Sequence, residues 1–189
     1  MQIVFRFNLQ KALQVLCYLL EKLGPTDKVK LIKLVYLADR THFIEHGTSI
    51  TGDRQCAMKW GPVPSCTLDA LNGEVRGADA ELFAFIHIND NRVEQRRSPG
   101  QALLSGAERD TLDRIIREHG AKQTWSLVEE THRLPEYVES YVEGTSTTIP
   151  YERIAKFSGS EARFRNDRAV ISLETAAQMT CPFPPDSDL

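Results

Sequence analysis

Apolar residues recur at helical spacing in two segments near the start of the chain. The first segment follows Asn8 and ends at Gly24, and the second follows Asp27 and ends at Gly47. Asn and Asp are favoured N-caps, and Gly often follows the last turn of a helix. The pattern therefore predicts two consecutive helices, each with a broad apolar side that packs into a core.

The middle of the chain has a different pattern. Residues 48–64 carry Gly and Pro without helical spacing, which favours a turn-rich stretch, and a helix is predicted over Cys66–Val75. Farther along, Phe83–Ile88 and Arg92–Arg97 have β-forming character on either side of an Asn-Asp-Asn turn. We predict a β-hairpin near residues 83–97 with one solvent-facing side.

Helical signals return in the second half. Ser105 and Glu108 have the spacing of a capping box, and Pro150 precedes an apolar segment that ends near Phe157. Two shorter helical pieces are predicted on either side of Pro135. The predicted fold class is mainly α, or α+β: a compact helical domain with a small β-hairpin or short antiparallel sheet.

The composition is that of an ordinary globular domain. The chain has 189 residues, of which 41% are hydrophobic and 26% are charged, and its formal net charge is −3. These values exclude an intrinsically disordered chain, a collagen and a disulfide scaffold. We expect one domain over residues 1–160 and a C-terminal extension over 161–189 whose proline-rich end is mobile.

The sequence shows neither a membrane segment nor a secretion signal. The longest early uncharged run, Ala12–Leu20, is too short to span a bilayer, and charged residues flank it without a cleavage site. The four cysteines, at positions 17, 56, 66 and 181, lack the CxxC spacing of zinc or redox sites. We expect four reduced thiols in a cytoplasmic protein.

One short string has the order of an inverted zinc-peptidase motif. His42, Glu45 and His46 form an H-x-x-E-H sequence, in which two histidines one helical turn apart share a metal ion and the Glu serves as base. Candidates for a third ligand, by sequence distance alone, are Glu118, Glu129 and Glu130. Histidines at the end of a helix also interact favourably with its dipole. We therefore expect no metal site, and a zinc-dependent hydrolase remains an alternative.

Arg92, Arg96 and Arg97 form the only local basic cluster in the sequence. Such a cluster is typical either of phosphate contacts or of the solvated edge of a hairpin. Because the chain is slightly acidic overall, DNA binding is not expected. A nucleic-acid-binding autoregulator is therefore kept as a second alternative.

Five blocks, in order, resemble a known family. Lys30–Asp39 is similar to the K-L-x-K-L-x-Y-x-A-D helix of the Panacea domain, the SocA/GepA-like group, and Ile50–Asp53 agrees with the next block. Ala57–Val63 is similar to its A-x-x-x-G-P-V stretch. Leu127–Tyr137 resembles its L-x-x-x-T-H-x-x-P-W element, with Tyr near the place of Trp, and Ile149–Ile154 resembles its closing I-x-x-E-x-I helix. The resemblance covers most of the chain.

The resemblance implies an antitoxin of a bacterial or prophage toxin–antitoxin system, which neutralises a cognate protein toxin by direct binding. One type in the family acts as an adaptor that presents its toxin to a AAA+ protease. The resemblance implies neither catalysis nor a cofactor. The residues expected to form the family motif or to bind the partner are Lys33, Tyr36, Asp39, Trp60, Gly61, Pro62 and His132.

Two interpretations remain open for these residues. Lys33, Tyr36 and Asp39 form either an internal hydrogen-bond cluster or a groove for the partner. Trp60 is either a core residue beside a sharp Gly-Pro turn or an exposed anchor, since tryptophan is enriched at the energetic centres of interfaces. His132 is expected to be a core histidine with its hydrogen bonds satisfied.

Overall fold

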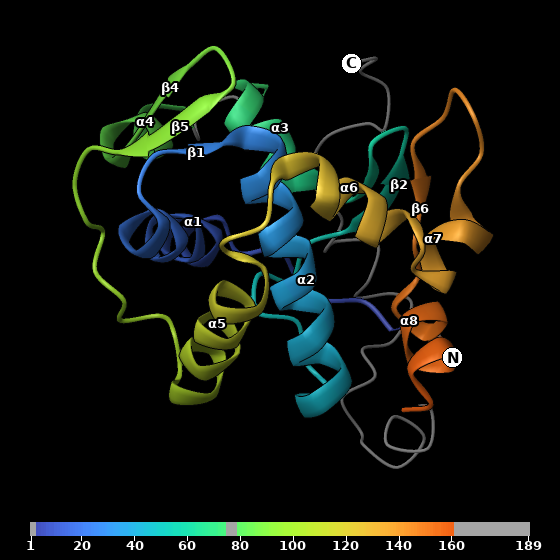
Figure 1. Ribbon diagram of the computed structural model, residues 1–189. Coiled ribbons are helices and arrows are strands. Elements are labelled where there is room, and N and C mark those ends of the chain that lie inside the picture. Colours follow the sequence, from blue (N-terminus) through green and yellow to red (C-terminus); the bar gives the residue numbers. More distant parts are fainter. Residues whose placement is uncertain (1–2, 75–78, 161–189) are drawn as a thin grey trace.

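Helix α2 (Lys28–His46) crosses the centre of the molecule, and the other elements pack around it (Figure 1). The computed structural model describes residues 3–74 and 79–160. The other helices in these ranges are α1 (Leu9–Leu23), α3 (Ser65–Asn72), α4 (Asp79–Phe85), α5 (Gly106–His119), α6 (Thr124–His132), α7 (Pro135–Ser140) and α8 (Tyr151–Ser158). The strands are β1 (Thr26–Asp27), β2 (Gln55–Met58), β3 (Gly61–Pro64), β4 (Ile86–Asn89), β5 (Arg92–Gln95) and β6 (Thr147–Thr148).

Local sequence sets the ends of the first two helices. The Asn8 side chain accepts a hydrogen bond from the backbone N–H of Lys11 at 3.0 Å, and Asp27 does the same for Lys30 at 3.2 Å. Gly47 ends α2 in the left-handed conformation, with φ at +77°. The capping box predicted at the start of α5 is also present. These features confirm the predicted helix boundaries.

Strands of the described residues form two small antiparallel sheets. One has the order β1-β5-β4, and the other has the order β3-β2-β6. In the second sheet, Met58 lies opposite Gly61, so Lys59 and Trp60 form the turn between β2 and β3. The predicted fold class, mainly α with short antiparallel sheets, is confirmed.

The predicted hairpin is present, but its first strand is shorter than expected. Phe83–Phe85 is the last part of α4, and the strand begins only at Ile86. The strand prediction for Phe83–Phe85 is therefore wrong. Leu82 in α4 and Ile86 at the start of β4 are both buried, with exposed fractions of 1% and 0%, so the change from helix to strand takes place within the core.

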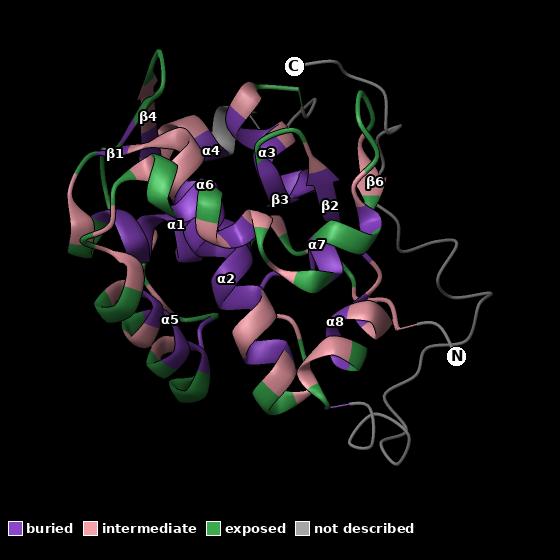
Figure 2. Ribbon diagram, turned by 45° about the vertical axis from the view of Figure 1, so that its right-hand side comes forward, coloured by how far each residue is buried: buried purple, intermediate pink, exposed green. Residues whose placement is uncertain are grey.

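The core is built mainly from the first two helices and from single apolar residues of the later ones (Figure 2). In α2, every residue from Leu31 to Asp39 is buried, the polar ones included. When a helix is buried on all sides, each of its polar groups needs a hydrogen-bond or ion-pair partner within the protein. Those partners define the candidate site.

Three other expectations concern the membrane, the cysteines and the C-terminus. Within residues 3–74 and 79–160, no helix is long and apolar enough to cross a membrane. Cys17 and Cys56 are free and buried, whereas Cys66 is disulfide-bonded, so the expectation of four reduced thiols is wrong at Cys66. Sequence spacing does not show which cysteines approach each other. The predicted C-terminal extension, 161–189, lies outside the described residues.

Candidate functional site

Three polar residues of the predicted motif lie along α2, inside the molecule. Lys33, Tyr36 and Asp39 follow one another at three-residue spacing, and their exposed fractions are 1%, 0% and 0%. Three residues are slightly less than one helical turn, so successive side chains point in gradually changing directions. Each of them therefore reaches a different segment of the chain.

Asp39 holds the stretch that follows α2. Its carboxylate accepts hydrogen bonds from the backbone N–H of Thr51, at 2.9 Å, from the Thr51 hydroxyl, and from the side-chain amide of Gln55, at 3.2 Å. Burial raises the pKa of Asp39, and the hydrogen bonds from Thr51 act against that rise. The Asp39 carboxylate is therefore engaged in internal hydrogen bonds.

Asp53 stabilises the start of α3. The N-cap of that helix, Pro64, provides no side-chain hydrogen bond. Asp53 accepts instead from the backbone N–H groups of Cys66 and Thr67, at 2.9 and 2.8 Å, and burial raises its pKa to about 7. Sequence reasoning missed this role, because a capping side chain usually lies within three residues of the N–H groups that it serves.

Tyr36 and Arg40 connect α2 to the beginning of α7. The Tyr36 hydroxyl donates to Glu136 Oε1 at 3.2 Å, and Arg40 forms an ion pair with the same carboxylate. The side chain of Glu136 is completely buried. A buried carboxylate needs both a counterion and hydrogen bonds, and these two side chains supply them.

Lys33 reaches the turn between β2 and β3. Its Nζ atom donates to the backbone carbonyl of Pro62 at 2.9 Å. No carboxylate forms an ion pair with Lys33 in the described parts of the chain, and burial lowers its pKa from 10.5 to about 7. Lys33 is therefore a buried amino group that holds this turn in place.

Gly61 makes this close approach possible. Its φ is +95°, a backbone conformation that residues with a Cβ atom rarely adopt. A Cβ atom at this position would lie 2.8 Å from Lys33 Nζ and 2.9 Å from His132 Cδ2. The Gly-Pro pair of the sequence motif therefore packs directly on Lys33 and on α6.

Replacing Gly61 with alanine is expected to lower the free energy of unfolding by about 2–3 kcal/mol, through backbone strain and displacement of the two neighbouring side chains. Urea denaturation measures this loss. Gly100→Ala is the matched control, because Gly100 also has a positive φ, +78°, but nothing lies within 4 Å of an added Cβ. Equal losses in the two variants would show that the contacts at Gly61 are unimportant.

His132 packs between this turn and α7. Its ring stacks on the Tyr137 ring with centroids 4.9 Å apart, and the Tyr137 hydroxyl donates to the Met58 carbonyl at 3.0 Å. Burial, together with nearby Lys33, lowers the pKa of His132. The backbone groups of Lys59 and Trp60 act against this shift, whereas Nε2 is buried without a hydrogen bond of ordinary geometry, so the expectation of a satisfied histidine is met only in part.

Trp60, at the tip of the same turn, lies on the surface. Its exposed fraction is 46%, and that of Trp125, at the start of α6, is 60%. The two rings meet edge to face with centroids 5.2 Å apart, and Lys59 Nζ lies 5.1 Å from the centre of the Trp60 ring. The interpretation of Trp60 as a core residue is wrong, because the buried contacts of this turn are made by its backbone and by Gly61.

Trp125 was not among the predicted site residues, although the sequence contains a signal for it. Leu127, Val128 and Thr131 are buried and mark the inner face of α6. At 100° per residue, Trp125 lies roughly 110° away from the mean direction of that face. A tryptophan placed off the apolar face of a short helix indicates a surface position.

Comparison with known families decides the assignment. The family model described as "Antitoxin SocA-like, Panacea domain" matches residues 31–136, more than half of the chain. The chain belongs to this Panacea-domain family. No curated protein and no solved structure matches it.

Membership of the Panacea-domain family gives the chain an antitoxin-type role in general terms. The matched range begins in α2 and ends at Glu136, the residue that Tyr36 and Arg40 bind. Within this range, the polar motif residues of α2 face other motif blocks rather than solvent. They form internal connections, as the first of the two interpretations proposed.

The histidine string does not form a metal site within the described residues. His42 Nδ1 lies 2.7 Å from the Thr48 carbonyl, and Glu45 forms an ion pair with Arg114 at 2.5 Å. The His42 and His46 rings are 4.5 Å apart, but no group of three or more His, Cys, Asp and Glu residues in 3–74 and 79–160 is arranged to hold a metal ion. Burial also lowers the pKa of His42. These contacts are those of a structural helix end.

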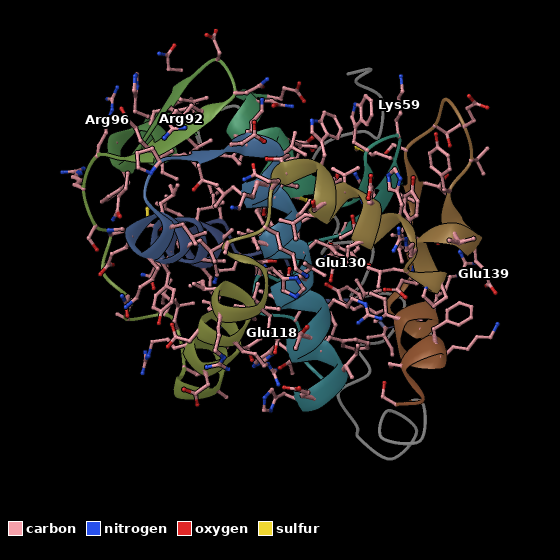
Figure 3. The ribbon with its side chains drawn as sticks, in the orientation of Figure 1. Lys59, Arg92, Arg96, Glu118, Glu130 and Glu139 are labelled. Carbon is pink, nitrogen blue, oxygen red and sulfur yellow. The ribbon has the colours of Figure 1, made fainter. Side chains whose placement is uncertain are left out.

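The arginine cluster has structural contacts as well. Arg96 donates to the Phe83 carbonyl at 3.4 Å, and Arg97 donates to the Ala84 carbonyl at 3.1 Å. Both carbonyls belong to the last turn of α4, where cations stabilise a helix. Figure 3 shows Arg92 and Arg96 at the upper left of the molecule and Lys59 at the upper right, on separate elements. The cluster therefore belongs to a different sheet from the turn that carries Trp60.

Proposed function

We propose that this Panacea-domain protein is the antitoxin of a bacterial or prophage type II toxin–antitoxin system and that it neutralises a cognate protein toxin by direct binding. The observation that carries the proposal is the family match over residues 31–136. The internal use of Lys33, Tyr36 and Asp39 supports it, because these polar groups are engaged in holding the fold. The protein then acts through its surface rather than through catalysis.

Occlusion of the toxin is the simplest mechanism for such a protein. The connections from α2 to the β2–β3 turn, to α7 and to residues 51–55 make the body rigid, so little conformational entropy is lost when a partner binds. A stable complex of this kind buries about 1,200–2,000 Å² of surface in total. Covering the active site of the toxin, or an essential surface on it, would stop its activity.

Coexpression with the product of the adjacent gene tests this function. We expect the neighbour alone to inhibit growth, and the pair to restore growth and to purify as a complex of fixed stoichiometry. The complex is measured by size-exclusion chromatography with light scattering. A neighbour that is harmless when expressed alone, or one that does not bind, would contradict the proposal.

An adaptor role is a more specific form of the same function. In that case the protein delivers the bound toxin to a AAA+ protease, and the half-life of the toxin becomes shorter when the antitoxin is present. Simple occlusion leaves the half-life unchanged or longer. A chase experiment after translation is stopped, in cells with and without the protease, distinguishes the two mechanisms.

A further inference from the structure

Two exposed tryptophans from separate segments meet on one face of the protein. We call Lys59, Trp60 and Trp125 the tryptophan surface. Single exposed apolar residues are common on proteins, but a contacting pair of half-exposed indole rings is a concentrated apolar surface. Tryptophan is also among the residues most enriched at the energetic centres of protein interfaces. This face is therefore suited to bind another molecule.

The tryptophan surface is held in place from beneath. Lys33 binds the Pro62 carbonyl on one side of the turn, and Tyr137 binds the Met58 carbonyl on the other. The turn that carries Trp60 is thus fixed at both ends by buried side chains. A surface fixed in this way binds a partner without first having to be ordered.

Charge restricts what kind of molecule fits. Lys59 stands over the Trp60 ring and has no ion-pair partner in residues 3–74 and 79–160, and Figure 3 shows it at the edge of the molecule. It can therefore pair with a carboxylate brought by a partner. Glu129, exposed one turn after Trp125, and the net charge of −3 both disfavour a row of closely spaced phosphates such as a nucleic-acid backbone, whereas a single carboxylate can approach from the Lys59 side.

We infer that the tryptophan surface is the docking site for the toxin, and that it receives a segment in which an apolar side chain stands beside a carboxylate. The apolar side chain packs against Trp60 and Trp125, and the carboxylate pairs with Lys59. This inference rests on the proposed function, since it names the surface through which the antitoxin binds. A two-fold dimer formed through this surface would place the two copies of Lys59 near each other, which like charge disfavours.

The decisive variant is Trp60→Ala combined with Trp125→Ala, tested by calorimetric titration with the toxin encoded by the adjacent gene. We expect the Kd to rise at least 100-fold, while the melting temperature of the free antitoxin stays within a few degrees because both side chains are exposed. Leu103→Ala is the matched control. Leu103 is also an exposed apolar residue, at 44%, but lies in the loop before α5.

The pairing of Lys59 with a carboxylate of the toxin is tested separately. Lys59→Glu is expected to raise the Kd at least 10-fold more than Lys59→Met does, because only the first adds repulsion. Lys22→Glu is the control, since Lys22 is an exposed lysine that also lies over an aromatic ring, that of the buried Tyr18 at 5.7 Å, in α1. Equal effects of the two Lys59 variants would overturn the carboxylate part of the inference.

The outcomes separate this inference from the proposed function. A tight wild-type complex whose Kd changes less than 3-fold in the double tryptophan variant overturns the docking site and leaves the function standing. A neighbour that fails to bind the wild-type protein contradicts the function itself. The wild-type protein is also tested for binding of a single-stranded RNA 20-mer and for dimerisation in sedimentation experiments. If either is observed and is lost in the double tryptophan variant, the tryptophan surface binds that molecule, and the toxin as its occupant is overturned.

Discussion

Replacing Arg40 with methionine is expected to lower the free energy of unfolding by about 3–5 kcal/mol, the usual cost of leaving one member of a buried ion pair alone. The carboxylate of Glu136 is completely buried, and its partners are Arg40 and the Tyr36 hydroxyl. Methionine keeps much of the side-chain volume but removes the counterion. The loss is measured by urea denaturation at neutral pH.

Two further variants make this expectation specific. Combining Arg40→Met with Glu136→Gln removes the buried charge together with its counterion, and should recover most of the lost stability. Arg114→Met breaks the ion pair with Glu45, whose members are both about one-third exposed, and should cost about 1 kcal/mol or less. If Arg40→Met costs no more than Arg114→Met, the pair with Glu136 does not hold α7 to α2.

Replacing Lys33 with methionine is expected to change how stability depends on pH. Burial lowers the pKa of Lys33 from 10.5 to about 7, so between these values the unfolded chain binds a proton that the folded protein does not. Stability therefore rises with pH through this window, by about 1.4 kcal/mol per pH unit and about 5 kcal/mol in all. In the methionine variant this rise should disappear.

The same change also shifts stability at neutral pH. Below about pH 7 the wild-type protein contains a buried charge, which the variant lacks, so Lys33→Met should be the more stable protein there despite the unpaired Pro62 carbonyl. Asp53 acts in the opposite direction, because its raised pKa makes stability fall as pH increases from 3.8 to about 7. At each pH, the difference between the free energies of unfolding of the wild-type protein and of Lys33→Met isolates the contribution of Lys33. If that difference stays constant from pH 7 to pH 10, the expectation is contradicted.

Lys33 in the motif of α2 and Arg40 directly after it also explain why this helix need not contact a partner in order to matter for function. Arg40 and Lys33 hold α7 and the β2–β3 turn, and both segments adjoin the exposed tryptophans through Tyr137 and Gly61. In the function that we propose, the motif supplies a rigid support and the exposed side chains supply the contacts. Substitutions in the motif are then expected to impair toxin neutralisation mainly through the stability of the antitoxin.

Much of the fold could be predicted from local sequence. The helix ends at Asn8, Asp27 and Gly47 follow from hydrogen bonds and dihedral angles that involve only residues three or four positions apart. The β4–β5 hairpin follows from its turn residues for the same reason. The strand assignment failed at Phe83–Phe85, which form the end of α4, because β-propensity depends strongly on tertiary context and does not by itself fix where a strand begins.

The sequence by itself determined the positions of most helices, the mainly α fold class and, through the order of its motif blocks, the Panacea-domain family. Only the tertiary structure decided what the motif residues do. Lys33 and its acceptor Pro62 are separated by 29 positions, and Tyr36 and Glu136 by 100. Such pairs depend on how the helices pack, and the packing of helices cannot be read from a local sequence pattern. For the same reason, only the folded chain shows that Trp60 meets Trp125 at the surface while a lysine lies buried beneath them.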